Sequence, residues 1–177
     1  MKLHIGCGKK FLKGFTHLDI IPYDHVDIVC DARNLKDVND KTVTEIYACH
    51  VLEHVKRIEL VDVLHEWHRV LKPNGWLRIA VPDFSAIVAE YNENKNLKSV
   101  QGLLFGGQTY DYNYHHVAFD FDMVKKLLEA VGFSGVETYD WREFLPIDYD
   151  DYSRAYLPHM DFKNGRLMSL NVIAKKK

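Results

Sequence analysis

Residues 66–84 read EWHRVLKPNGWLRIAVPDF, and this stretch decides the fold because it joins a helical pattern to a strand through one turn. Its helical part belongs to a longer apolar repeat at steps of four, three and four, formed by Leu60, Leu64, Trp67 and Leu71. The Pro73-Asn74-Gly75 turn predicts the end of this helix. The apolar run at 76–81 then predicts a buried strand.

Upstream of this unit, four short apolar segments predict further strands, at Lys2 to Ile5, Phe15 to Ile20, Val26 to Cys30 and Thr44 to Cys49. The first of them runs directly into the glycine turn Gly6-Cys7-Gly8. Strands, glycine turns and helices in alternation are typical of a mostly parallel sheet with helices on both faces. We therefore predict an α/β, Rossmann-like, doubly wound fold.

The second half of the chain is less regular. Its apolar pattern predicts a helix from Phe84 that fades at 92–96, followed by a glycine- and tyrosine-rich loop or lid at 102–116. A second helix is predicted at 122–131, ended by Gly132, and strands are predicted at 136–141 and 166–174. The total is seven strands, and the last two could form a hairpin-like edge. We expect a single domain over residues 1–177, with a cofactor half at about 1–82 and an acceptor half at about 83–177.

Composition excludes several classes of protein. The chain has 23 basic and 25 acidic side chains and a net charge of −2, so no basic excess indicates nucleic acid as a partner. No apolar stretch reaches the roughly 18 residues of a membrane span. The three widely spaced cysteines do not suggest a disulfide framework, which favours a cytoplasmic location.

Glycines and carboxylates at three strand ends predict a nucleotide-type site. Glycines after a first strand let a ligand approach the backbone and leave N–H groups free to donate. Asp19 ends the second predicted strand, where a carboxylate can accept both hydroxyls of a ribose. Asp31 ends the third, within reach of an adenine amino group. Strand ends meet on one side of an open α/β sheet, so these residues can line one crevice.

The sequence resembles class I S-adenosylmethionine (SAM)-dependent methyltransferases, especially small bacterial or phage-type enzymes associated with sugar and surface-polysaccharide metabolism. The matching stretches are LHIGCG (3–8), FTHLDI (15–20), DIVCDARNL (27–35), IYACHVLEHV (46–55), residues 66–84 and LLEAVGF (127–133). The resemblance implies that the cofactor contacts Gly6, Cys7, Gly8, Asp19, Ile20, Asp31, Ala32 and His50. Two departures are Lys9, where a third glycine is usual, and a segment from Gly8 to Phe15 that is too short for a full first helix.

Two competing cofactors are less consistent with the sequence. A dinucleotide needs Gly-x-Gly-x-x-Gly, but Phe occupies position 11, where the third glycine would lie. The run His50-Val51-Leu52-Glu53-His54 spells a zinc-protease pattern, which requires a helix that carries both histidines. Here the run straddles a strand end, so we expect no metal.

Methyl transfer to a hydroxyl or amine also needs a group that accepts a proton, and histidine titrates near neutrality. His115 and His116 at the end of the tyrosine-rich loop are the leading candidates, with Asp83 and His50 as further ones. The resemblance matches His115 to a histidine that follows a Gly-Gly-Gln stretch in related sequences. The acidic, aromatic segment at 148–159 is more typical of a solvated loop than of an acceptor rim or a partner surface.

These observations predict a methyltransferase that acts on a small-molecule acceptor. A sugar or sugar nucleotide is the leading acceptor class, from the resemblance alone. A non-catalytic SAM-binding module is the second hypothesis. A nucleic-acid methyltransferase is third, because the fourth strand ends in Ala48-Cys49-His50 and not in the Asn/Asp-Pro-Pro-aromatic run of many base-modifying enzymes.

Overall fold

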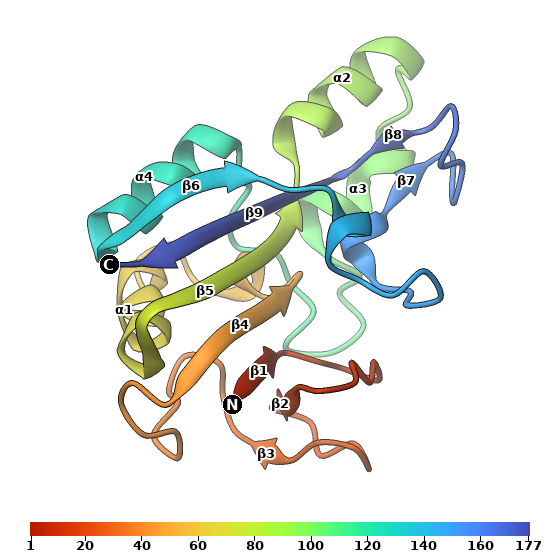
Figure 1. The fold of residues 1–177 in the computed structure, drawn as a ribbon. Helices are drawn as coiled ribbons and strands as arrows, with labels where there is room; N and C mark the ends of the chain where they lie inside the picture. The colour runs from red at the N-terminus through yellow and green to blue at the C-terminus, as the bar shows by residue number, and fades with distance from the viewer.

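The computed structural model describes residues 1–177 and contains one seven-stranded sheet in the order β3-β2-β1-β4-β5-β9-β6 (Figure 1). Every neighbouring pair from β3 to β5 is parallel, and β9 is antiparallel to both β5 and β6. The strands are β1 (Lys2–Ile5), β2 (Thr16–Asp19), β3 (Ile28–Val29), β4 (Val43–Cys49), β5 (Leu71–Pro82), β6 (Phe133–Thr138) and β9 (Ser169–Lys176). The predicted Rossmann-like, mostly parallel, seven-stranded sheet is confirmed.

The last strand lies inside the sheet and not at its edge. The predicted hairpin-like pair does form between β6 and β9, but β9 also pairs with β5 along seven residue positions. Six of the eight residues of β9 are buried, as expected for a strand covered on both faces. β6 therefore forms the edge.

Two amphipathic helices cover one face of the sheet. α1 (Leu60–Val70) and α4 (Phe121–Val131) pack against each other and enclose the main apolar core, which includes Leu3, Ile46 and Leu77. Gly132 ends α4 in the left-handed conformation, as predicted. α1 ends at Val70, before the Pro73-Asn74-Gly75 turn that was predicted to stop it, because β5 already begins at Leu71 and the turn is looped out of its ladder with β4.

Two further helices lie beyond the carboxyl end of β5 (Figure 1). α2 (Phe84–Asn94) begins where predicted, with Asp83 accepting a hydrogen bond from the Ser85 N–H. α3 (Leu97–Phe105) corrects the prediction of a loop from residue 102, because Asn96 caps this helix and Val100 anchors it in a small apolar cluster. The irregular, tyrosine-rich segment therefore begins at Gly106.

The second face of the sheet is covered by residues 139–156 and not by long helices. Two short 3-10 helices, Trp141–Glu143 and Tyr152–Arg154, lie over it, and Trp141 and Leu145 pack against Tyr47 of β4. The adjacent chain forms the small sheet of β7 (Tyr156–Leu157) and β8 (Arg166–Leu167). No long helix connects β1 to β2, so this segment covers apolar surface that would otherwise face water.

The prediction of a solvated loop at 148–159 is therefore wrong for the core of that segment. Arg154 is only 8% exposed, lies between the rings of Trp141 and Phe162, and donates to two backbone carbonyls. Such stacking and hydrogen bonding allow the guanidinium to be buried. Elsewhere, the three cysteines are unpaired, and none of the helices has the length and apolar character that a membrane crossing requires.

Candidate active site

A single cavity of about 1100 Å³ opens at the carboxyl ends of β1, β2, β3 and β4. Residues 106–116 and 149–160 form its other walls. All the predicted cofactor residues line it, namely Gly6, Cys7, Gly8, Asp19, Ile20, Asp31, Ala32 and His50. Ligand pockets commonly measure about 300–1,000 Å³, so this one has room for a nucleoside-sized ligand together with a small second molecule.

The glycine turn after β1 needs both of its glycines, for different reasons. Gly6 and Gly8 have φ of 63° and 55°, the left-handed region that favours glycine. A Cβ on Gly6 would lie 2.4 Å from Val51 Cγ2, so this position has no space for a side chain. A Cβ on Gly8 would meet no atom within 4 Å, because Gly8 borders the cavity. The open surface at Gly8 fits the close approach of a ligand.

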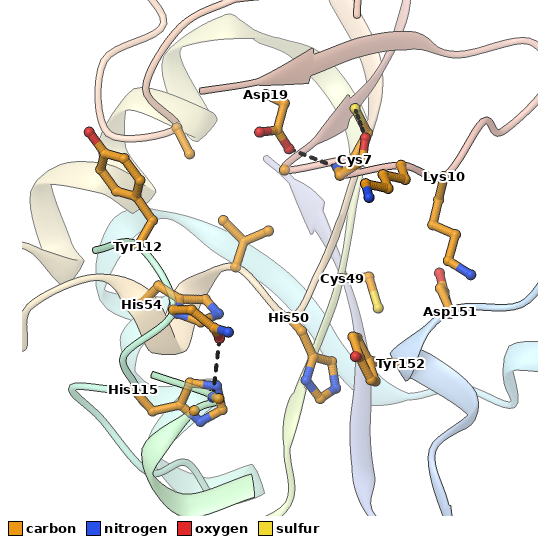
Figure 2. A pocket seen from close by; sticks show the side chains of 18 of the residues that line it. Cys7, Lys10, Asp19, Cys49, His50, His54, Tyr112, His115, Asp151 and Tyr152 are labelled. Atoms are coloured by element: carbon orange, nitrogen blue, oxygen red, sulfur yellow. Dashed lines mark hydrogen bonds between the residues drawn. The ribbon is translucent and has the colours of Figure 1, made fainter. Parts of the chain in front are cut away.

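Asp19 links the glycine turn to the end of β2. One carboxylate oxygen accepts the Gly8 N–H at 2.7 Å, and the other accepts the Ile21 N–H at 2.9 Å (Figure 2). Each carboxylate oxygen has more than one acceptor direction, so these bonds leave capacity for a ligand hydroxyl. Asp19 is thus both a structural support of the turn and part of the cavity wall, a double role that the sequence did not reveal.

The carboxylate at the end of β3 already has a partner within the protein. Asp31 forms a bidentate ion pair with Arg33, whose hydrogen bonds lower the pKa of Asp31. The backbone of Ala32 is fixed by Trp67, whose indole N–H donates to the Ala32 carbonyl at 2.8 Å. Arg33 itself lines the cavity. An adenine contact at this position would therefore involve a carboxylate that Arg33 already orients.

Cys7 and Lys10 complete the wall near the glycine turn. Burial and the nearby Asp19 raise the pKa of the Cys7 thiol to about 12, so this cysteine stays protonated and is no nucleophile near neutral pH. Lys10 lies 3.6 Å from Asp150, and this ion pair connects the glycine-turn loop to the segment that covers the second face. This contact brings the two walls of the cavity together.

His50 follows β4 with a φ of 53°, which is unusual for a residue other than glycine. Its Nδ1 lies 3.1 Å from Glu53 Oε1, and its Nε2 lies 3.3 Å from Ser169 Oγ. The ring packs 5.3 Å from that of Tyr152 (Figure 2). Its Nε2 is thus hydrogen-bonded within the protein, and its Nδ1 faces the Glu53 carboxylate. His50 lines the cavity as part of its wall.

The structure separates the three predicted catalytic residues. His115 and His116 line the cavity, whereas Asp83 does not, because its carboxylate caps α2. His115 is largely buried, its Nδ1 lies 2.9 Å from the Leu103 carbonyl oxygen, and burial lowers its pKa. The ring of the exposed His116 makes no hydrogen bond or ion pair, although its backbone N–H donates to the Glu53 carbonyl. Asp83 is therefore not a catalytic candidate.

Two features of the site went beyond the sequence analysis. Glu53 is fully buried beside three histidines, and only the zinc-protease-like run drew attention to it. The hydroxyl of Tyr47 donates to Asp151 at 2.5 Å, which ties β4 to the opposite wall. Tyr47 and Asp151 are 104 positions apart, and no local sequence pattern indicates that they are in contact.

Comparisons with known proteins agree with this fold. A family described as a methyltransferase domain matches residues 3–79, and no curated protein sequence matches the chain significantly. A SAM-dependent methyltransferase from Archaeoglobus fulgidus aligns at 18% identity and a TM-score of 0.58, over 98% of this chain and 85% of the other. A possible histamine N-methyltransferase from Thermotoga maritima aligns at 17% identity and a TM-score of 0.57, over 99% and 81%.

A third similar structure carries a ligand. It is 1,6-didemethyltoxoflavin-N1-methyltransferase from Burkholderia thailandensis with S-adenosylhomocysteine bound, at 14% identity and a TM-score of 0.56, over 92% of this chain and 61% of the other. The fold is thus the Rossmann-like fold of methyltransferases, and the matched domain includes the glycine turn and Asp19.

Proposed function

We propose that this protein is a SAM-dependent methyltransferase that acts on a hydroxyl or amine of a small molecule, with a sugar or sugar nucleotide as the leading acceptor class. One observation carries the proposal: a single cavity has the glycine turn and Asp19 toward one end and His54 and His115 toward the other (Figure 2), with tyrosines along its walls. Its size suits two ligands side by side. We assign the first end to the cofactor, with residues 1–82 as the cofactor half, and the second to the acceptor, which residues 83–177 mainly form.

The residues at the cofactor end fit SAM. Gly8 offers open backbone, Asp19 retains acceptor capacity for ribose hydroxyls, and Asp31 with Ala32 borders the place of the adenine. Gly6, Cys7, Ile20 and His50 complete this part of the wall. When bound, SAM supplies a methyl group on a positively charged sulfur. The task of the protein is then to hold an acceptor atom in line with that methyl group and to exclude water.

The acceptor end combines flat aromatic surface with polar groups. Tyr110, Tyr112 and Tyr114 line the cavity from the irregular segment, and Tyr152 and Tyr156 line it from the opposite side. A tyrosine ring offers apolar area and one hydroxyl that can donate or accept. Such a lining supports a small polyhydroxylated ligand such as a sugar ring.

We propose His116 as the group that accepts the proton of the acceptor. It borders the cavity, its ring has no partner in the protein, and its exposure lets a captured proton pass to water. His115 is less suited because burial lowers its pKa, which makes it a weaker base. In this arrangement His115 shapes the acceptor end, and His116 takes the proton.

The proposal is tested first by calorimetric titration with SAM and with S-adenosylhomocysteine, and then by an assay for S-adenosylhomocysteine production with sugars, sugar nucleotides and small amines. We expect binding of both ligands and turnover with an acceptor from the panel. Replacement of His116 by Ala should lower turnover by about 100-fold or more and leave cofactor affinity unchanged. Replacement of the exposed His65 of α1 is the matched control. Cofactor binding without turnover on any acceptor would favour the binding-module hypothesis.

A further inference from the structure

Glu53 is the least expected residue near the cavity. It lies in the short 3-10 helix Leu52–His54 and is 0% exposed, and neither carboxylate oxygen accepts a hydrogen bond with good geometry. A buried carboxylate without such partners is costly unless a positive group compensates it. The Glu53 side chain lies beside three histidines, His50, His54 and His115.

Three of these side chains converge, two from neighbouring positions and one from a distant part of the chain. One ligand atom from each of Glu53, His54 and His115 lies within 4.8 Å of the other two. Nε2 of His115 is 4.0 Å from Glu53 Oε1, and the rings of His54 and His115 meet edge to face with centroids 4.8 Å apart. Figure 2 shows the two histidines next to each other at the end of the pocket opposite Asp19.

The hydrogen bonds of both histidines define their tautomers. Nδ1 of His54 lies 3.1 Å from the Tyr114 carbonyl oxygen, and Nδ1 of His115 lies 2.9 Å from the Leu103 carbonyl oxygen. A carbonyl oxygen only accepts, so each Nδ1 carries a proton, and in the neutral ring each Nε2 then keeps its lone pair. Metal-bound histidines are commonly oriented in this way, with one ring N–H donated to a backbone carbonyl.

We propose that Glu53, His54 and His115 bind one divalent transition-metal ion. Two imidazole nitrogens and one carboxylate suit Zn²⁺, Fe²⁺ or Co²⁺, whereas Mg²⁺ and Ca²⁺ prefer oxygen ligands. Metal–nitrogen distances of about 2.0–2.1 Å place ligand atoms about 3.3 Å apart, so modest side-chain rotations close the site. The zinc-protease-like run would use His50 and His54 as the two histidine ligands. In the structure, Nδ1 of His50 faces Glu53 instead, and the second histidine ligand is His115.

The proposed ion would have open coordination positions toward the cavity. His54 and His115 line the cavity and Glu53 lies behind them, so a ligand oxygen can reach the ion from the acceptor end. An ion there would hold an acceptor hydroxyl and lower its pKa, and the proton would pass to His116. This role rests on the proposed function, whereas the binding of the ion does not.

The experiment measures metal binding without any methyl acceptor. The full-length protein is stripped with a chelator and titrated with Zn²⁺ and with Co²⁺, with calorimetry for stoichiometry and visible absorbance for the Co²⁺ ligand field. We expect one ion per chain. Glu53→Gln, which keeps the side-chain size, and His54→Ala should each weaken binding by at least about 100-fold, since loss of an outer-shell partner alone costs about 10–100-fold.

His65→Ala is the matched control, because His65 is exposed on α1 and outside the cluster. Circular dichroism and SAM affinity are recorded on each sample, and His115→Ala replaces any variant that does not fold. The proposal is overturned if both ions bind with a Kd above about 1 mM, or if the cluster variants bind as well as the control. Metal binding without SAM binding would instead contradict the proposed function.

Discussion

Replacement of Gly6 by Ala tests how tightly the glycine turn is packed. The left-handed backbone at Gly6 costs an L-residue about 1–2 kcal/mol, and the added methyl meets Val51 Cγ2 at 2.4 Å. Insertion of a methyl into a packed site costs about 1–3 kcal/mol. We therefore expect Gly6→Ala to lower the free energy of unfolding by about 2–5 kcal/mol.

Gly8→Ala is the matched control, because Gly8 has a similar φ and no atom within 4 Å of an added Cβ. It should cost only the backbone part, about 1–2 kcal/mol, but it places a methyl group in the cavity and should weaken SAM binding. The absence of a side chain is thus needed for different reasons: at Gly6 for the stability of the fold, and at Gly8 for the approach of the ligand.

The measurement is urea unfolding of Gly6→Ala, Gly8→Ala, Val51→Ala and the Gly6/Val51 double variant. Val51→Ala removes the methyl that Gly6→Ala would strike, so the double variant should recover about 1–3 kcal/mol relative to the sum of the single changes. Equal losses for the two glycine variants, together with additive behaviour at Gly6 and Val51, would refute the reasoning.

Three further predictions concern the buried polar groups. Burial lowers the pKa of His4 to about 3, so between about pH 6.5 and 3 the unfolded chain takes up a proton that the folded chain does not. The folded state therefore loses stability as the pH falls, and His4→Phe should remove up to about 3 kcal/mol of the loss reached by about pH 4. Urea unfolding at a series of pH values measures this difference. Asp19→Asn should raise the Kd for SAM, measured by calorimetry, and lower the free energy of unfolding by about 1–3 kcal/mol. The reason is that an amide group cannot accept from both the Gly8 and Ile21 N–H groups. Unchanged affinity would remove Asp19 from the cofactor site. Tyr47→Phe should speed hydrogen exchange in residues 139–156, because it leaves Asp151 without its tyrosine donor; unchanged exchange would show that the apolar packing alone holds this segment.

Residues near one another in the chain determined much of the fold. The bounds of β1 and the αL glycine after α4 agree with the sequence prediction, because apolar period and glycine position are local properties. The glycine turn and Asp19 reach the same cavity because consecutive parallel strands end on one side of the sheet. These features follow from short segments whose own pattern specifies strand, turn or helix.

Tertiary structure decided which side chains meet. Asp31 is oriented by Arg33, Asp83 is used as a helix cap, and residues 139–156 cover a sheet face that no long helix reaches. Glu53 and His115 are 62 positions apart and meet only because the chain after α3 returns to the end of β4. Their proximity depends on how separate elements share buried space, and no local pattern encodes that. The sequence alone thus determined the sheet and its ligand-facing edge, whereas packing across long separations decided the chemistry at the acceptor end.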